Sequence, residues 1–339
     1  MALRRFASIA RVFLFGLSFT YIIGCGTGTP PAVPSAQPSA VNDGPKLGYF
    51  WSATERSLRP ILGVPGSSQV GESIVPAGVY VSGTAAADTG LLLTTEGNLF
   101  ALHLPAPTTI PVTTGLADNA TLRLSPSGTA AIAYATNSAS IALITGLPDA
   151  PKLQSLSAPP NLLSAAVSDN ATVLTASASG NSVTISLARI GQSSPITTIA
   201  ALGGLNFIPS SDDALITDSA RNTLTLIRNV QSAPVAQMIA ASGLNHPAAV
   251  TASRDGRYAV IANSADKNLI RVDLTAASAP AIVPCTCQSD RVESVDGNAV
   301  FRVTDIGATA GWLIDADPAS PQTLFIPAFQ ATGNAGGAK

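Results

Sequence analysis

Charged side chains are scarce in this sequence. Only 11% of its 339 residues are Asp, Glu, Lys or Arg, and only 5% are Phe, Trp or Tyr. So little charge excludes a coiled coil, while a hydrophobic fraction of 46% excludes a disordered acidic chain because that much apolar surface can form a core. The 18 basic residues are outnumbered by 20 acidic ones and form no basic run beyond the first dozen residues, which argues against nucleic-acid binding.

Histidine is nearly absent too, since His103 and His246 are the only two. Two histidines exclude a three-histidine metal site, and a catalytic triad would have to use one of them. The sequence also lacks a phosphate-binding loop, a dinucleotide fingerprint and a Gly-x-Ser-x-Gly motif. We therefore predict no cofactor and no metal, and a binding role is favoured over an enzymatic one.

The first 24 residues have the pattern of a secretion signal. Three arginines stand within the first eleven residues, and an apolar run follows at 12–24 that is too short to cross a bilayer as a helix. The run ends at Gly24-Cys25, which resembles the bacterial lipobox, and the resemblance implies that Cys25 carries a lipid and becomes the first residue. An ordinary signal peptide with an incidental cysteine and an uncleaved membrane anchor are the alternatives.

A lipidated Cys25 would be followed by a tether. Residues 25–45 contain five prolines and almost no large apolar side chain, so we predict an extended linker. Without residues 1–24 the chain keeps 15 basic and 20 acidic side chains, which predicts a mildly acidic surface. Gly26 stands where many Gram-negative lipoproteins of the inner membrane carry Asp, so the resemblance implies a bacterial cell-envelope protein at the outer membrane or cell surface.

An internal repeat fills the rest of the sequence. An apolar residue that follows a small or polar one, after a short turn, recurs at spacings of 41 to 45 residues: Leu58, Leu99, Ile141, Val183, Leu224, Leu269 and Trp312. A period near 42 with four short strands per repeat is typical of a propeller blade. We therefore predict an all-β, seven-bladed β-propeller with four-stranded antiparallel blades over 46–329, followed by a disordered tail at 330–339. A six-bladed ring with an extra hairpin is the alternative.

The sixth repeat is the clearest and the first is the least regular. The sixth predicts strands at 247–253, 258–263, 268–274 and 280–285. In the first repeat, 47–52 and 57–63 fit a second and a third strand. Its innermost strand would then have to come from 37–41, which contains Pro38, so we expect the ring to close through a partial pairing.

Two repeats carry the residues of a known superfamily. The stretches Val260-Ile261-Ala262-Asn263 and Tyr134-Ala135-Thr136-Asn137 each follow a Ser-x-x-Gly turn. They resemble the Tyr-Val-Thr-Asn signature of a seven-bladed propeller superfamily that includes lactonase-like enzymes and many secreted proteins of unknown role. The resemblance implies the architecture and is nearly silent on activity. Signatures of the WD40, sialidase and kelch propellers are missing.

Polar residues in the loops that enter the innermost strands form the candidate ligand site. We predict a binding rim from five of them: His246, Asp290, Arg291, Asn161 and Asn206. Such loops surround the central channel, where a guanidinium fork and amides can hold a sugar or a small anion. The same residues can instead serve only to satisfy the backbone of their turns.

The remaining reactive side chains receive structural interpretations. Cys285 and Cys287 are two residues apart in an exported chain, so we favour a local disulfide or two capped thiols over a redox or metal role. His103 alternates with leucines on a third strand and is expected to be exposed or hydrogen-bonded there. Asp212 and Asp213 replace the Asp-Gly turn of other repeats, on the face opposite the rim, which argues against an acid–base pair.

These observations favour a lipid-anchored envelope propeller that acts as a binding or protein-interaction scaffold, with an envelope protein or a saccharide as its partner. One alternative is a lactonase-like or carbohydrate-active enzyme that uses His246, Asp290 and Arg291. Another is an envelope assembly lipoprotein that presents sheet edges to client strands.

Overall fold

The computed structural model describes residues 44–76, 78–136, 138–276, 278–285, 290–304, 306–307, 309–319 and 321–329, all within one compact unit at 34–339. These residues form 27 β-strands and no helix, so none of them belongs to a helix able to cross a membrane. The predicted signal at 1–24, the predicted lipidation site at Cys25, the predicted tether up to residue 43 and the predicted tail at 330–339 lie outside the described residues.

The strands form seven antiparallel sheets, each built from consecutive strands, which we number as blades 1 to 7. Blades 1 to 4 contain β1 (Lys46–Ser52), β2 (Ser57–Val64), β3 (Ser67–Val70); β4 (Tyr80–Ala86), β5 (Thr89–Thr94), β6 (Leu99–His103), β7 (Thr108–Thr113); β8 (Thr121–Leu124), β9 (Ala130–Tyr134), β10 (Ser140–Thr145), β11 (Lys152–Ser157); β12 (Leu162–Val167), β13 (Val173–Ser179), β14 (Ser182–Arg189) and β15 (Gln192–Ile199). Blades 5 to 7 contain β16 (Leu202–Phe207), β17 (Ala214–Asp218), β18 (Thr223–Arg228), β19 (Val235–Ala240); β20 (Pro247–Ala252), β21 (Tyr258–Asn263), β22 (Asn268–Asp273), β23 (Ala281–Val283); β24 (Glu293–Ser294), β25 (Val300–Arg302), β26 (Gly311–Asp315) and β27 (Gln322–Ile326).

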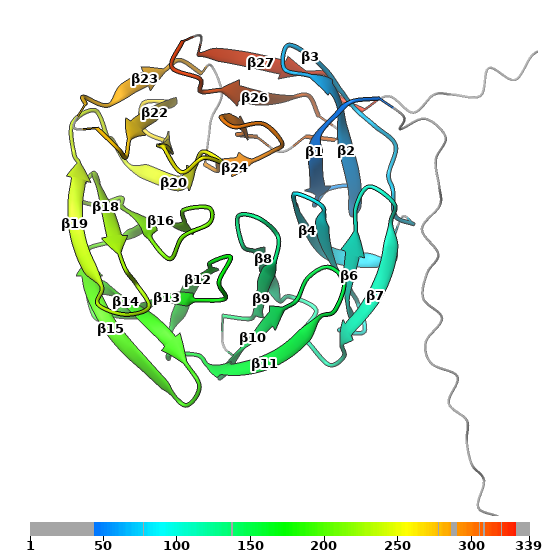
Figure 1. Cartoon of the computed structure of the whole chain (residues 1–339), viewed down its shortest axis with the longest axis horizontal. Coiled ribbons are helices and arrows are strands. Elements are labelled where there is room, and N and C mark those ends of the chain that lie inside the picture. Colours follow the sequence, from blue (N-terminus) through cyan, green and yellow to red (C-terminus); the bar gives the residue numbers. More distant parts are fainter. Residues whose placement is uncertain are drawn as a thin grey trace, which may run out of the picture. The chain divides into compact units, whose positions relative to one another are not determined.

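The blades stand around a common centre, with the first strand of each innermost and the last outermost (Figure 1). First strands of neighbouring blades contact each other, as β4 contacts β8 and β16 contacts β20. The prediction of a seven-bladed β-propeller is therefore confirmed. The four strands predicted for the sixth repeat appear as β20 to β23.

Blade 1 corrects the strand assignment made from the sequence. β1 is the innermost strand, because it contacts β4 and lines the central cavity, and 57–63 belongs to the second strand rather than the third. The backbone N–H groups of Gly71 and Ile74 continue the pairing to β2 beyond β3, at 2.9 Å each, and the described residues form no fourth strand in this blade. The mark at Leu58 was placed in a third strand because a short polar turn joins the first strand of a blade to the second as well as the second to the third. Residues 37–41 lie outside the described residues.

The apolar core lies between the blades. Buried residues of the described chain form seven clusters, and each cluster combines side chains from two neighbouring blades. In one of them Leu58 of blade 1 packs with Tyr80 and Leu102 of blade 2. The second strands β9, β17 and β21 are buried along their whole length, because a blade covers each of their faces. Stacking the blades this way leaves few positions for charge, which explains the low charge of the sequence.

Small residues let the innermost strands approach each other, as the composition suggests. A Cβ atom on Gly203 of β16 would overlap the carbonyl oxygen of Pro247 in β20, and one on Gly204 would lie 2.6 Å from the backbone nitrogen of Val250. Only hydrogen fits at these two positions.

Side chains of the turns after the innermost strands join neighbouring blades. The Asp169 carboxylate accepts hydrogen bonds from the backbone N–H of Ser127 in blade 3 and of Ser210 in blade 5, both at 2.8 Å. Asp255 and Asn298 bond reciprocally between blades 6 and 7 at 2.8 and 2.9 Å. These partners are 41 to 43 residues apart, so the period of the repeat is also the spacing of the bonds that fix blade to blade.

At the opposite end of the blades, a polar residue at the end of a second strand holds the loop that enters the innermost strand. Asp218, which ends β17, accepts hydrogen bonds from the backbone N–H groups of four residues: Ala200, Ala201, Ala220 and Arg221. Asn263, which ends β21, accepts one from Asn245 and donates to the carbonyl of Gly243. Asn263 is the last residue of the Tyr-Val-Thr-Asn-like stretch, so that position serves to fix a loop.

The ring closes where blade 1, the first along the chain, packs against blade 7, the last. The backbone N–H of Asp296 donates to the carbonyl of Leu47 at 2.6 Å, and an apolar cluster around Phe50 joins the two sheets. The guanidinium of Arg59 lies 3.8 Å from the ring centre of Phe329, beyond the last strand. Among the described residues, closure therefore relies on direct contact between the three-stranded sheet of blade 1 and the four-stranded sheet of blade 7.

Candidate functional site

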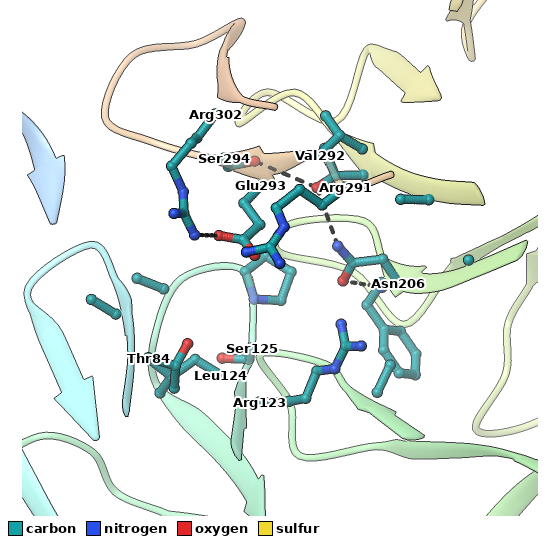
Figure 2. A pocket seen from close by; sticks show the side chains of 18 of the residues that line it. Thr84, Arg123, Leu124, Ser125, Asn206, Arg291, Val292, Glu293, Ser294 and Arg302 are labelled. Carbon is teal, nitrogen blue, oxygen red and sulfur yellow. Dashed lines mark hydrogen bonds and ion pairs between the residues drawn. The ribbon is translucent and has the colours of Figure 1, made fainter. Parts of the chain in front are cut away.

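The first strands of all seven blades surround a central cavity of about 540 Å³. Much of its lining is Gly, Ala, Ser and Thr, because the innermost strands must crowd together. Charged residues are concentrated on one part of it, where blade 7 faces blade 3: Arg123, Asp290, Arg291, Glu293 and Arg302. Figure 2 shows the three arginines and Glu293 from close by.

Arg302 and Glu293 form an ion pair within blade 7. The two residues are direct cross-strand partners in β25 and β24, and a guanidinium nitrogen of Arg302 donates to the carboxylate of Glu293. Arg302 is only 3% exposed, and its guanidinium lies 5.3 Å from the ring centre of Phe50 in blade 1. The Glu293 side chain is 51% exposed, toward the cavity. Arg302 therefore fixes the position of a carboxylate that a ligand can reach.

Arg123 and Arg291 direct their guanidinium groups into the same cavity from different blades (Figure 2). Arg291 precedes β24 and is 41% exposed, with Asp290 at 3.9 Å from its Nε. Arg123 belongs to β8 of blade 3, and its side chain forms no hydrogen bond or ion pair within the described part of the chain. Two positively charged forks are thus open to a bound molecule.

The arginines keep Glu293 ionised. Burial among protein atoms raises the pKa of this carboxyl, but the charges of Arg302, Arg291 and Arg123 and the hydrogen bond from Arg302 together hold the pKa below its usual value. At neutral pH Glu293 is therefore an acceptor of hydrogen bonds and not a proton donor. Three guanidinium groups lie with the two carboxylates of Glu293 and Asp290, which leaves this part of the cavity with a net positive charge in a chain that carries more acids than bases overall.

A row of uncharged polar groups borders the charged cluster. The Asn206 amide of β16 donates to the Thr251 hydroxyl of β20 at 3.1 Å, and that hydroxyl lies 3.5 Å from the Ser294 hydroxyl of β24. The row crosses blades 5, 6 and 7 and fixes the orientation of the Asn206 side chain. Its remaining N–H and the hydroxyl groups line the cavity and can contact a polar ligand.

Away from the cluster around Arg123, the cavity is lined by a second charged group that contains acidic residues. Arg254 lies 3.6 Å from Asp296 there. Burial, together with the negative charges of Asp296 and Asp88, raises the pKa of Tyr49 to about 12. The pKa of Asp296 is raised chiefly by burial, against the charge of Arg254. These acidic groups make this part of the cavity less suited to an anion than the cluster around Arg123.

The structure brings three of the five predicted rim residues to the cavity and leaves two outside its lining. Asp290, Arg291 and Asn206 line it. Asn161 is exposed with a φ of 55°, and its backbone carbonyl accepts a hydrogen bond from the N–H of Ala178. This bond continues the pairing between β12 and β13 at the entrance to β12.

His246 serves its own turn. Its Nδ1 lies 3.0 Å from the Ser264 hydroxyl, that hydroxyl donates to the carbonyl of His246 at 2.7 Å, and the His246 N–H donates to the Asn222 side chain at 2.8 Å. Its φ of 55° places it in the left-handed region that turns use. These contacts link the loops of blades 5 and 6 and account for the residue without a ligand.

Sequence reasoning did not include Arg123, Arg302 and Glu293 in the predicted site. Arg123 had a usable signal, because it is the only arginine within the first strands, which are otherwise rich in small residues. Arg302 carried no such signal, because it lies in a second strand and its sequence position does not indicate that its guanidinium reaches the cavity.

The other reactive residues lie where the sequence placed them or outside the described part. His103 ends β6 on the surface, with Nδ1 3.1 Å from Asp149, and Asp212 and Asp213 lie in the turn between β16 and β17. Cys285 is disulfide-bonded, whereas Cys287 lies outside the described residues, so their pairing stays a prediction. Among the described residues no group of three or more His, Cys, Asp or Glu side chains is placed to hold a metal ion.

Comparison with known structures shows the fold. The chain is similar to a functionally unknown protein from Desulfotomaculum acetoxidans, with a TM-score of 0.57 and 10% identity over 83% of this chain and 99% of that one. It is also similar to the β-propeller domain of Cps50 (Swd1) from Myceliophteria thermophila (TM-score 0.51, 10% identity, 74% and 88% covered) and to virginiamycin B lyase from Staphylococcus aureus (0.51, 11%, 73% and 83%). No family model matches the chain, and no curated protein matches its sequence. The protein is a seven-bladed β-propeller, and identities this low carry no activity over to it.

Proposed function

We propose that this protein is a lipid-anchored binding propeller of the bacterial cell envelope, and that the central cavity binds a small anionic ligand. The observation that carries the ligand site is the excess of arginine in the cavity, with Arg123 open to solvent and free of a protein partner among the described residues. The lipid anchor is supported by the sequence alone, through the apolar run that ends at Gly24-Cys25.

The state of Glu293 argues against one catalytic role at this site, that of a general acid. A lactonase-like or carbohydrate-active enzyme would use a carboxyl that can give and take a proton near neutral pH. Glu293 is held ionised by its arginine neighbours, so it is suited to orient a ligand and not to donate a proton.

Lipid attachment is tested by Cys25→Ser. The thiol is the atom to which the lipid would be joined, so we expect the variant to lose incorporation of labelled palmitate and to leave the membrane fraction. The same fractionation of the wild-type protein is the control. A variant that stays in the membrane fraction with its label would contradict lipidation at Cys25.

Anion binding is tested by thermal unfolding of the purified protein with acetate or inorganic phosphate, against sodium chloride at equal ionic strength. At ligand concentrations well above Kd we expect both anions to raise Tm by about 3 °C. Arg123→Gln should remove this rise because it removes one of the two open guanidinium groups. His246→Ala is the matched control and should keep it, since His246 lies outside the cavity lining. Loss of the rise in His246→Ala alone would place the site at the predicted rim and not in the cavity.

A further inference from the structure

The cavity offers a ligand two kinds of contact close together. Arg123 and Arg291 supply N–H donors with positive charge. Glu293 supplies an ionised carboxylate, which can only accept hydrogen bonds, and about half of its side chain is open to the cavity. A molecule bound here must therefore carry a negative group for the arginines and hydrogen-bond donors for Glu293.

We infer that the ligand of the cavity is an acidic saccharide, a sugar unit that bears a carboxylate. This inference rests on the proposed binding function and specifies its ligand. The carboxylate lies between Arg123 and Arg291, where two planar forks can each donate paired N–H groups to it. Hydroxyl groups of the same sugar donate to Glu293 and contact the amide of Asn206 beside it.

Other ligand classes fit the charges less well. A neutral sugar leaves the net positive charge of the cluster without a counter-charge. A simple anion such as acetate satisfies the arginines but brings no donor to Glu293, whose negative charge repels it. An amino acid brings an ammonium group to Glu293, but its zero net charge does not balance a cluster with three guanidinium groups and two carboxylates, those of Glu293 and Asp290. The cavity of about 540 Å³ has room for one or two sugar units.

Isothermal titration calorimetry of the mature protein tests the inference with four probes: D-glucuronate, D-glucose, acetate and inorganic phosphate. We expect D-glucuronate to bind at least about tenfold more tightly than each of the others, because only it engages both the arginines and Glu293. Glu293→Gln should weaken the binding of D-glucuronate by about tenfold, since an amide is a weaker acceptor than a carboxylate. The same change should tighten the binding of acetate and phosphate, since an amide does not repel anions. Gln keeps an oxygen for Arg302, so the fold should persist; near-wild-type Tm checks this.

Two further variants separate failure of the inference from failure of the proposed function. Arg123→Gln should weaken every anionic probe, whereas Arg189→Gln, a surface arginine of blade 4, should change none. If acetate and phosphate bind through Arg123 as tightly as D-glucuronate does, or if Glu293→Gln leaves the ratio of their affinities to that of D-glucuronate unchanged, the saccharide inference is wrong and the anion site stands. If Arg123→Gln alters the binding of no anion, both proposals are wrong.

Discussion

Replacing Asp218 by alanine is expected to lower the free energy of unfolding by about 3 kcal/mol, because the change removes a buried carboxylate and leaves several backbone N–H groups without their acceptor. Asp218 is 2% exposed and accepts from four of them, so one carboxylate fixes both the loop before β16 and the turn after β17. In a chain of this length such a loss corresponds to a Tm lower by about 5 to 10 °C. Urea unfolding followed by circular dichroism measures it.

Asp218→Asn is the matched variant, since the equivalent position at the end of the second strand of blade 6 is an asparagine, Asn263. Three of the four bonds go to one carboxylate oxygen, which the amide oxygen can replace, while the N–H of Ala200 loses its acceptor. We therefore expect a loss of about 1 kcal/mol at neutral pH. A loss as large as that of the alanine variant would show that charge, and not hydrogen bonding, dominates at this position.

The advantage of aspartate over asparagine at position 218 should depend on pH. Burial raises the pKa of Asp218, but the hydrogen bonds from the N–H groups of Ala200, Arg221, Ala201 and Ala220 outweigh burial and hold the pKa below its ordinary value of 3.8. A carboxyl with a lower pKa in the folded state stabilises the fold above its unfolded pKa, and this contribution is lost as the pH falls through the folded pKa. The difference between wild type and Asp218→Asn should therefore shrink below about pH 4. A difference that stays constant down to about pH 3 would contradict the assignment.

Gly203→Ala is the second substitution with a large expected effect. Its Cβ would overlap the Pro247 carbonyl oxygen, which belongs to the backbone of β20 and cannot rotate away. Strands β16 and β20 would have to separate, at a cost of about 2 to 3 kcal/mol. Because the Asn206–Thr251 hydrogen bond joins the same two strands, we also expect weaker binding of D-glucuronate.

Gly44→Ala is the control for Gly203→Ala, since no atom lies within 4 Å of a Cβ at that position. It should leave the free energy of unfolding within about 0.5 kcal/mol of wild type. Equal stability of the two alanine variants in urea would show that blades 5 and 6 can move apart at little cost and would contradict the crowding described here.

Local and periodic features of the fold could be predicted from the sequence. The Asp255-Gly256 turn and the strands around it predicted the strand pattern of one blade, and the even spacing of the apolar residues predicted the number of blades. Blade 1 could not be assigned this way, because Leu58 follows a short polar turn in the same manner as Leu99, although the first turn joins strands one and two and the second joins strands two and three. Only the contact of β1 with β4 distinguishes these cases.

The candidate site was predictable in part. Loop positions pointed to Arg291, Asp290 and Asn206, which line the cavity, but also to His246 and Asn161, which lie outside its lining. Arg123 lies near Glu293 because blades 3 and 7, which are not neighbours in the ring, face each other across the cavity. Sequence spacing carries no information on which side chains of distant blades face each other across the axis.

The central claim is that the cavity between the first strands is where this propeller binds its ligand. Diffraction from crystals of the mature protein soaked in D-glucuronate tests it most directly. We predict difference density in the cavity, with the carboxylate between Arg123 and Arg291 and a hydroxyl at Glu293. Density for the sugar acid on the outer surface alone, with the cavity free of it at saturating concentration, would contradict the claim.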